Sequence, residues 1–177
     1  MKKYLVEIKG VSPILQNKNA EISDKTEKKG EGKDSSEHAK YKLYTYEGKI
    51  YQPAIHLEQA LIKAGTGIKQ KGMGKKTYKD LFKGSVFIRP DNIIHKIQKW
   101  EVHETTVVIP ATRGRIARYR PMLKEWILEF ELENLDDRLD ESVIKLALDE
   151  AGRTIGIGDW RPRYGRFIVS KFKELKV

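Results

Sequence analysis

Arginine residues gather in two short segments after residue 112. The first segment, 113–120, holds four arginines within eight residues and no acidic residue. A guanidinium group offers several N–H donors in a planar fork that fits phosphate oxygens, and it also stacks on nucleobases. Tyr119 adds an aromatic surface of the kind that single-strand binding proteins use. We expect this segment to bind a nucleic-acid backbone. The alternative is a solvated loop whose arginines pair with glutamates of a nearby strand.

The second segment, 156–166, combines glycine, arginine and aromatic residues. Glycine lets a backbone turn tightly and approach a ligand closely, because it has no Cβ. Arginines alternate here with Trp160 and Tyr164, so charge and aromatic faces share one loop. A second interpretation is compatible with the first: Trp160 fills the core and Asp159 pairs with an arginine. The segment reads Gly156-Ile157-Gly158-Asp159-Trp160-Arg161-Pro162-Arg163-Tyr164-Gly165-Arg166.

A third basic segment is rich in lysine, with seven lysines and one acid between Lys63 and Lys83. It superficially resembles a nucleotide-binding P-loop, but Lys69 and Lys76 stand where that motif needs a glycine and a Ser or Thr. The segment either contacts nucleic acid or is a solvated surface. The full set of expected nucleic-acid-binding residues is Arg113, Arg115, Arg118, Tyr119, Arg120, Trp160, Arg161, Arg163, Tyr164, Arg166, Lys69, Lys71, Lys75 and Lys76.

Catalytic groups are few. His56, near the start of a predicted helix, could act as a general base for metal-free RNA cleavage with Tyr51 or a lysine assisting. A histidine at such a position more often packs or forms a hydrogen bond. The chain has no cysteine, which excludes disulfides, thiolate zinc sites and iron–sulfur clusters, and its four histidines show no metal-binding spacing. We therefore expect no cofactor and no metal, although magnesium held by carboxylates stays open.

The charge balance favours a polyanionic partner. The chain has 35 basic and 25 acidic residues, a formal net charge of +10, and each phosphate that a protein neutralises releases condensed counterions. Acidic residues are concentrated between Glu125 and Glu141, with eight carboxylates against one arginine. Such segregation suits a nucleic-acid channel, and it would also let subunits stack by opposite charge.

The predicted elements form one α+β domain over residues 1–177. Their order, once insertions are removed, is strand, helix, strand, strand, helix, strand. This is the βαββαβ arrangement of ferredoxin-like and RRM-like folds, an antiparallel sheet with helices on one face. A flexible insertion is expected at about 17–42 and the lysine-rich loop at about 65–77. The expected strands are 4–9, 85–89, 104–109, 123–133 and 167–173, with a hairpin over 44–51 and helices over 53–65 and 140–152.

No window of the sequence approaches the apolar length needed to span a bilayer. The first residues do not lead into a secretory signal, because Glu7 and Lys9 interrupt the apolar pattern. The sequence therefore predicts a cytoplasmic protein.

The element order and two stretches resemble the RAMP superfamily of CRISPR-associated RNA-binding proteins. The stretches are 156–167, similar to the family's glycine-rich loop before the last strand, and 48–61, similar to its proline-introduced first helix. The Ser-Ser-Lys-Gly type sequence before that helix is replaced by Ala54-Ile55-His56-Leu57. The resemblance implies RNA-backbone binding and subunits that polymerise along RNA. The differences from the family pattern indicate a divergent relative, such as a protein from a phage or another mobile element.

Together these patterns predict non-catalytic binding of single-stranded nucleic acid, RNA in preference to DNA. Two alternatives remain open. One is a metal-independent endoribonuclease of the guide-RNA-processing type, and the other is a structural or assembly protein of a mobile element. The expected partners are single-stranded RNA or DNA and further copies of the chain, as a homo-oligomer or a filament along nucleic acid, with no membrane.

Overall fold

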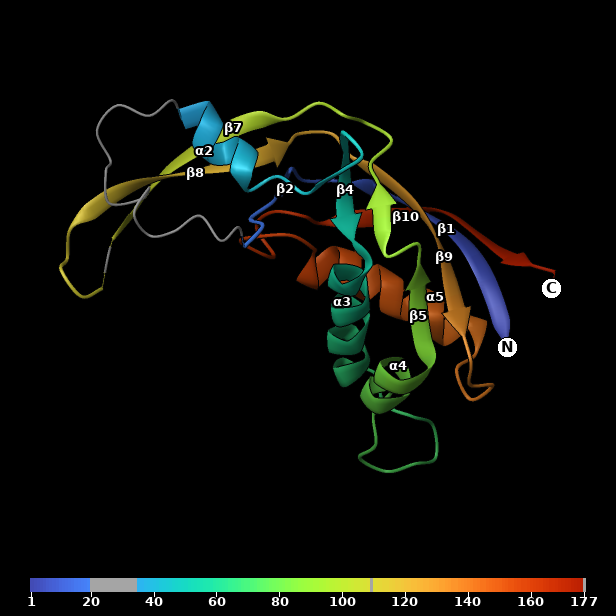
Figure 1. The fold of residues 1–177 in the computed structure, drawn as a ribbon. Coiled ribbons are helices and arrows are strands. Elements are labelled where there is room, and N and C mark those ends of the chain that lie inside the picture. The colour runs from blue at the N-terminus through green and yellow to red at the C-terminus, as the bar shows by residue number, and fades with distance from the viewer. Residues whose placement is uncertain (20–34, 109, 177) are drawn as a thin grey trace.

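The computed structural model describes residues 1–19, 35–108 and 110–176, which combine helices with antiparallel strands (Figure 1). The predicted α+β class is therefore confirmed. In chain order the elements are β1 (Lys2–Gly10), β2 (Ile14–Leu15), α2 (Ser35–Tyr41), β3 (Thr45–Tyr46), β4 (Lys49–Pro53), α3 (Ala54–Gly67), α4 (Lys79–Ser85), β5 (Val86–Arg89), β6 (Asn92–Ile94), β7 (Glu101–Val108), β8 (Arg115–Leu123), β9 (Ile127–Asn134), α5 (Glu141–Glu150), a π-helical turn η1 (Ala151–Ile155) and β10 (Phe167–Leu175).

The largest sheet has the strand order β10-β1-β9-β5, and each neighbouring pair is antiparallel. Tyr4, Val6 and Ile8 on β1 are fully buried, as their alternation in the sequence predicts. Val6 pairs with Phe130 of β9, so the buried residues of both strands line the same face. The single strand expected over 123–133 is divided between β8 and β9, on either side of the buried Trp126.

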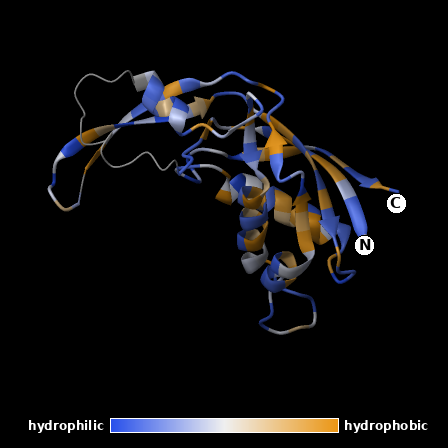
Figure 2. Cartoon of the chain, viewed as in Figure 1, coloured by the Kyte–Doolittle hydropathy of each residue, from blue (hydrophilic) through white to orange (hydrophobic). Residues whose placement is uncertain are grey.

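Helices α3 and α5 supply the hydrophobic core that packs against this sheet (Figure 2). Leu57 and Leu61 of α3 and Ile144 and Leu148 of α5 are at most 1% exposed. Removal of such apolar area from water is the main favourable term in folding. The helix expected over 140–152 thus turns an apolar side, with Ile144 and Leu148, to the core.

Helix α3 begins after Pro53, as predicted, and runs two residues past the expected end at Gly65. Gly65 is needed for packing and does not end the helix. A Cβ at this position would lie 2.6 Å from the ring of Phe82 on α4, closer than carbon atoms can approach. Without a side chain, Gly65 lets α4 lie directly against α3.

The other face of the large sheet carries ion pairs. The Lys96 ammonium lies 2.5 Å from Glu7 and 3.1 Å from Glu129, and Lys3 lies 2.7 Å from Glu133. Two glutamates of the acidic stretch, Glu129 and Glu133, thus pair with lysines from other parts of the chain. Glutamates of this face therefore have lysine partners.

Strands β7 and β8 form a long two-stranded arm that projects from the body of the protein (Figure 1). At the base of the arm, β2 adds to the edge of β8 to give the order β2-β8-β7, while β3, β4 and β6 form a third sheet. Helix α2 packs against the arm, with Ala39 fully buried. This helix lies inside the insertion that was expected at 17–42. Residues 20–34 of that insertion lie outside the described part of the chain.

No helix among the described residues is long and apolar enough to cross a membrane.

Candidate nucleic-acid interface

The two arginine-rich segments meet at the base of the arm. The Nε–H of Arg120, on β8, donates to the Asp159 carboxylate in the glycine-rich loop. The same guanidinium lies over the indole of Trp160, with its carbon 4.8 Å from the ring centroid. The Arg120 side chain is only 12% exposed. It therefore holds the loop against the arm, and the charge of Asp159 compensates its own.

Two further aromatic contacts fix the loop on the arm. The Tyr164 hydroxyl lies 3.1 Å from Nε2 of His103, which faces Arg120 across the β7–β8 pair. The rings of His103 and Trp160 meet edge to face at 6.0 Å, and the rings of Trp160 and Tyr164 lie 6.3 Å apart at 28°. Trp160 is nevertheless 39% exposed. Trp160 is therefore anchored on one side and open to solvent on the other, while Tyr164 is half-buried.

The glycines of this loop let it pack closely against other backbone segments of the protein. A Cβ on Gly165 would lie 1.7 Å from the carbonyl oxygen of Ile157, and one on Gly158 would lie 2.5 Å from that of Leu15. Both glycines have positive φ, at 76° and 85°. The N–H groups of Ile157 and Asp159 donate to the carbonyls of Gly165 and Leu15. The sequence predicted that these glycines let the backbone approach a ligand closely. In the structure they approach the backbone around Leu15 and Ile157.

The exposed side of the loop is basic. Arg161, Arg163 and Arg166 are exposed, and none of them forms an ion pair with any residue that the structure describes. Arg118 lies on the same face of the arm as Arg120, because alternate residues of a strand share a face. We call Arg118, Trp160, Arg161, Arg163, Tyr164 and Arg166 together the arm–loop surface.

Other expected site residues lie elsewhere. Tyr119 and Arg115 are on the opposite face of the arm, where the Tyr119 ring meets His38 of α2 at 6.3 Å, edge to face. Arg113 is exposed in the turn at the tip of the arm. From Arg120 to Arg115 the strand rises about 17 Å. The tip therefore extends the basic region without contacting the loop.

The lysine-rich loop is at another end of the molecule, below α4 in Figure 1 and far from the arm. It is folded on itself: the N–H of Gln70 donates to the carbonyl of Lys76 (2.9 Å), and the Gln70 side chain donates to that of Thr77 (2.7 Å). Lys69, Lys71, Lys75 and Lys76 are exposed around this turn. The structure thus separates the four lysines from the arginine-rich segments.

His56 lies in the first turn of α3, in contact with Gln52 of β4 and with Tyr44, which lies just before β3. Its Nδ1 is 2.5 Å from Nε2 of Gln52, and its ring meets that of Tyr44 edge to face at 5.7 Å. Burial lowers the pKa of His56, and the positive charge of Arg161 lowers it further. Arg161 thus acts on His56 through its charge.

The pKa values of His103 and Tyr44 are also shifted by charged residues of the arm and the glycine-rich loop. The pKa of His103 is lowered by burial and then by the charges of Arg120 and Arg163. The pKa of Tyr44 is raised by burial, and Tyr51 and Asp159 raise it further. Both histidines near the loop are therefore neutral at pH 7, and arginines supply the positive charge of this region.

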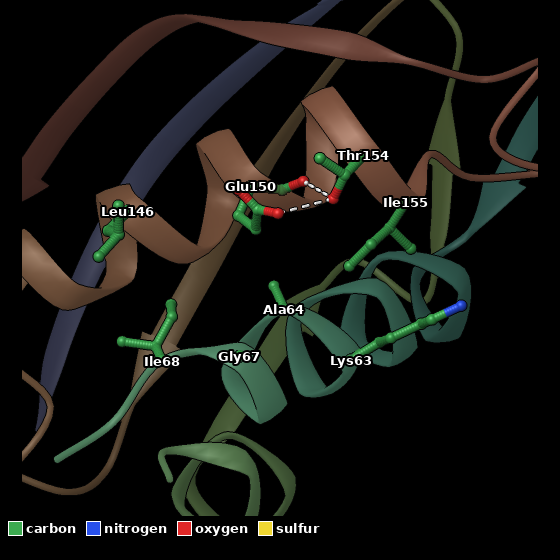
Figure 3. Close-up of a pocket in the computed structure, with 8 residues that line it drawn as sticks. All are labelled: Lys63, Ala64, Gly67, Ile68, Leu146, Glu150, Thr154 and Ile155. Carbon is green, nitrogen blue, oxygen red and sulfur yellow. Dashed lines mark hydrogen bonds between the residues drawn. The ribbon is translucent and has the colours of Figure 1, made fainter.

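A hollow of about 490 Å³ between α3 and the α5–η1 segment is shown in Figure 3. Its walls are mostly apolar, with Ala64, Leu146 and Ile155 among them. The Glu150 carboxylate at its edge already accepts hydrogen bonds from Thr154 and Arg153. No expected nucleic-acid-binding residue lines it, and the described residues include no group of three His, Cys, Asp or Glu able to hold a metal ion.

Four residues that matter here were not singled out in the sequence: Gln16, Tyr44, Gln52 and His103. Gln16 and Gln52 are 36 positions apart and meet only through the fold. His103 had one available signal, since it alternates with Thr105 on a strand that pairs with the arginine segment. Recognising 115–123 as a strand would have assigned Arg118 and Arg120 to one face and Tyr119 to the other.

Comparison with known proteins supports a likeness of fold. No family model matches the sequence, and a search of curated proteins finds no relative. Among solved structures, a chain of the type III-B Cmr-beta complex bound to cognate target RNA matches with a TM-score of 0.61 at 14% identity, covering 99% of this chain and 61% of that one. A CRISPR protein from Archaeoglobus fulgidus matches with a TM-score of 0.42 at 15% identity, covering 99% of this chain and 65% of that one.

The chain thus spans less than two thirds of the length of either structure. The expected resemblance is confirmed as a likeness of fold to a chain of the Cmr-beta complex.

Proposed function

We propose that this protein binds single-stranded nucleic acid, RNA in preference to DNA, through the arm–loop surface and without catalysis. The observation that carries the proposal is the contact of Arg120 with both Asp159 and Trp160. This contact joins the two arginine-rich segments, and it leaves Arg161, Arg163 and Arg166 exposed without a carboxylate partner among the described residues. These guanidinium groups, beside the exposed ring of Trp160, suit a strand with accessible phosphates and unstacked bases.

The preference for RNA rests on the fold. The Cmr-beta structure that this chain resembles is bound to target RNA. We further propose a single ferredoxin-like domain in which β1, α3, β5, β9, α5 and β10 are the βαββαβ core. The strand order β10-β1-β9-β5 with antiparallel neighbours supports this assignment. Assembly along RNA remains a prediction, which light scattering with and without RNA would check.

A fluorescence-anisotropy titration tests the proposal. Fluorescein-labelled single-stranded RNA and DNA of one sequence are titrated with the chain at low and moderate salt. We expect saturable binding that is tighter for RNA and weakens as salt rises. Absence of binding to either strand at low salt would refute the proposal.

A matched pair of triple variants locates the surface. Arg161→Ala, Arg163→Ala and Arg166→Ala together remove three charges from the arm–loop surface. Lys71→Ala, Lys75→Ala and Lys76→Ala together remove three charges from the lysine-rich loop. Both variants change the net charge equally, so long-range attraction falls by a similar amount in each. We expect the arginine variant to lose much more affinity. Equal losses would show that net charge alone drives binding.

A further inference from the structure

Two backbone groups fix the orientation of the buried side chain of Gln16. Its Oε1 accepts the N–H of Tyr44 at 2.9 Å, and its Nε2 donates to the carbonyl of Tyr51 at 2.8 Å. A backbone N–H can only donate and a carbonyl can only accept. The amide oxygen and nitrogen of Gln16 therefore cannot be exchanged.

The orientation of Gln16 determines that of Gln52. Nε2 of Gln16 lies 3.2 Å from an amide atom of Gln52, and this atom must be an acceptor, Oε1. The amino group of Gln52 is then the atom 2.5 Å from Nδ1 of His56. Gln16 is 1% and Gln52 0% exposed, so bulk water does not compete for these bonds.

The amino group of Gln52 fixes the tautomer of His56. Because the amide donates, Nδ1 of His56 must accept, and a neutral imidazole then carries its proton on Nε2. Protonation of Nδ1 would set two donors against each other. Burial and the charge of Arg161 also lower the pKa of His56, which keeps the ring neutral. Some buried ring nitrogens of the described residues lack a hydrogen-bond partner, but Nε2 of His56 is not one of them. His56 thus presents an N–H donor.

We propose that the Nε2–H of His56 and the guanidinium of Arg161 together hold one phosphodiester group of the bound strand. The inference rests on the proposed function and assigns one of its phosphate contacts. An imidazole N–H and a guanidinium are both pure donors, so together they match the oxygens of a phosphodiester. The loop reaches this site through its backbone: the N–H of Asp159, two residues before Arg161, donates to the carbonyl of Leu15, the neighbour of Gln16.

The same geometry opposes the role of His56 as a general base. Its one lone pair, on Nδ1, is engaged by Gln52, and Nε2 already carries a proton. No nitrogen of the ring is left to take a proton from a ribose hydroxyl. Gln16 and Gln52 are positioning residues that fix His56 as a donor.

Nuclear magnetic resonance of the full chain tests the tautomer without any ligand. Long-range proton–nitrogen correlation spectra distinguish a protonated from an unprotonated ring nitrogen. For His56 at neutral pH we expect protonated Nε2 and unprotonated Nδ1. In Gln52→Met, which keeps the side-chain volume and removes the donor, we expect a mixture of both tautomers. A proton on Nδ1 in the unaltered chain would overturn the proposal.

Binding of fluorescein-labelled oligouridylate tests the phosphate site. His56→Phe keeps the ring but removes the donor, and we expect an affinity loss of about fivefold, the size of one hydrogen bond. His56→Gln restores an N–H donor and should recover most of the affinity. His38→Phe is the same change on α2 and should have no effect. If His56→Phe does not fold, comparison of His56→Gln with His56→Met replaces it.

A double-variant cycle tests whether His56 and Arg161 share one phosphate. The double variant should lose less affinity than the product of the losses in His56→Phe and Arg161→Gln. Either single change already weakens the hold on the shared phosphate, so the second change has less left to remove. If the chain binds but His56→Phe binds equally tightly, the site is refuted and the proposed function stands. If the unaltered chain binds neither RNA nor DNA, both fail.

Discussion

Arg120 lies over the indole of Trp160, 4.8 Å from the ring centroid, while its Nε–H donates to the neighbouring Asp159. One side chain of the arm thereby holds two consecutive residues of the glycine-rich loop. The arginines that follow them, Arg161 and Arg163, are left exposed. Arg120, one of the arginines expected to bind phosphate, is thus the one that anchors the loop.

Replacement of Arg120 by methionine should destabilise the protein. The change removes a hydrogen bond between two partly buried charged groups and the cation–π contact, so we expect a loss of about 2 kcal/mol in the free energy of unfolding. Urea denaturation followed by circular dichroism measures this loss. Arg115→Met, the same change at an exposed position of β8, is the control and should leave stability nearly unchanged. Equal effects would mean that Arg120 does not anchor the loop.

Replacement of Gly165 by alanine should disrupt the loop. The new Cβ would meet the carbonyl oxygen of Ile157 at 1.7 Å, and a φ of 76° is strained for alanine. Gly67→Ala is the matched control, because open space surrounds that position at the end of α3 and its φ is not positive. We expect a large drop in melting temperature for the first variant and no drop for the second. A folded Gly165→Ala with unchanged melting would contradict the close approach.

Stability should fall between about pH 6.5 and pH 4 because of His95. Its ring is 1% exposed and packs edge to face on Trp126, and burial lowers its pKa from 6.5 to about 4. The unfolded chain then binds a proton more readily than the folded one, so stability is complete above pH 6.5 and declines as the pH falls. The lowered pKa of His95 corresponds to a change of about 3 kcal/mol in the free energy of unfolding between the two ends of this pH range.

Urea denaturation across this pH range measures the effect. His95→Phe keeps an aromatic ring against Trp126 and should show a shallower decline with falling pH. His56 and His103, whose pKa values are also lowered, remain in both proteins and cancel in the comparison. Parallel profiles for the two proteins would exclude His95 as the cause.

The salt dependence of RNA binding should report the number of phosphate contacts. If Arg113, Arg161, Arg163 and Arg166 each neutralise one phosphate, log affinity should fall with log salt at a slope of about −3, since each contact to a single strand contributes about −0.7. Arg163→Ala should reduce the slope by one contact, whereas Arg120→Met should reduce affinity mainly through loss of structure. An unchanged slope in Arg163→Ala would remove this arginine from the interface.

Much of the core could be predicted from local patterns. Tyr4, Val6 and Ile8 alternate along β1, and the apolar residues of α5 recur at helical spacing. In each case the apolar residues share one face of one element, and that face is buried. The segment that forms β8, from Arg115 onward, was harder to assign, because its glycine- and arginine-rich surroundings have the composition of a loop. Pairing with β7 makes it a strand, and this pairing separates Arg120 from Tyr119 onto opposite faces.

The relationships that build the site are non-local. Asp159 lies 39 residues after Arg120, and Gln52 lies 36 residues after Gln16. No spacing rule connects such pairs, since their contact depends on how β2, β4 and the glycine-rich loop converge. The sequence could therefore indicate which residue types bind phosphate, but it could not tell an anchoring arginine from an exposed one.

Ultraviolet cross-linking of single-stranded RNA to the full chain, with the attached peptides identified by mass spectrometry, tests the binding surface most directly. Cross-links should fall on the segment that contains Trp160 and Tyr164, because exposed aromatic rings that stack on bases lie within bonding distance of them. Cross-links confined to the lysine-rich loop or to the charged outer face of the large sheet would contradict the arm–loop surface.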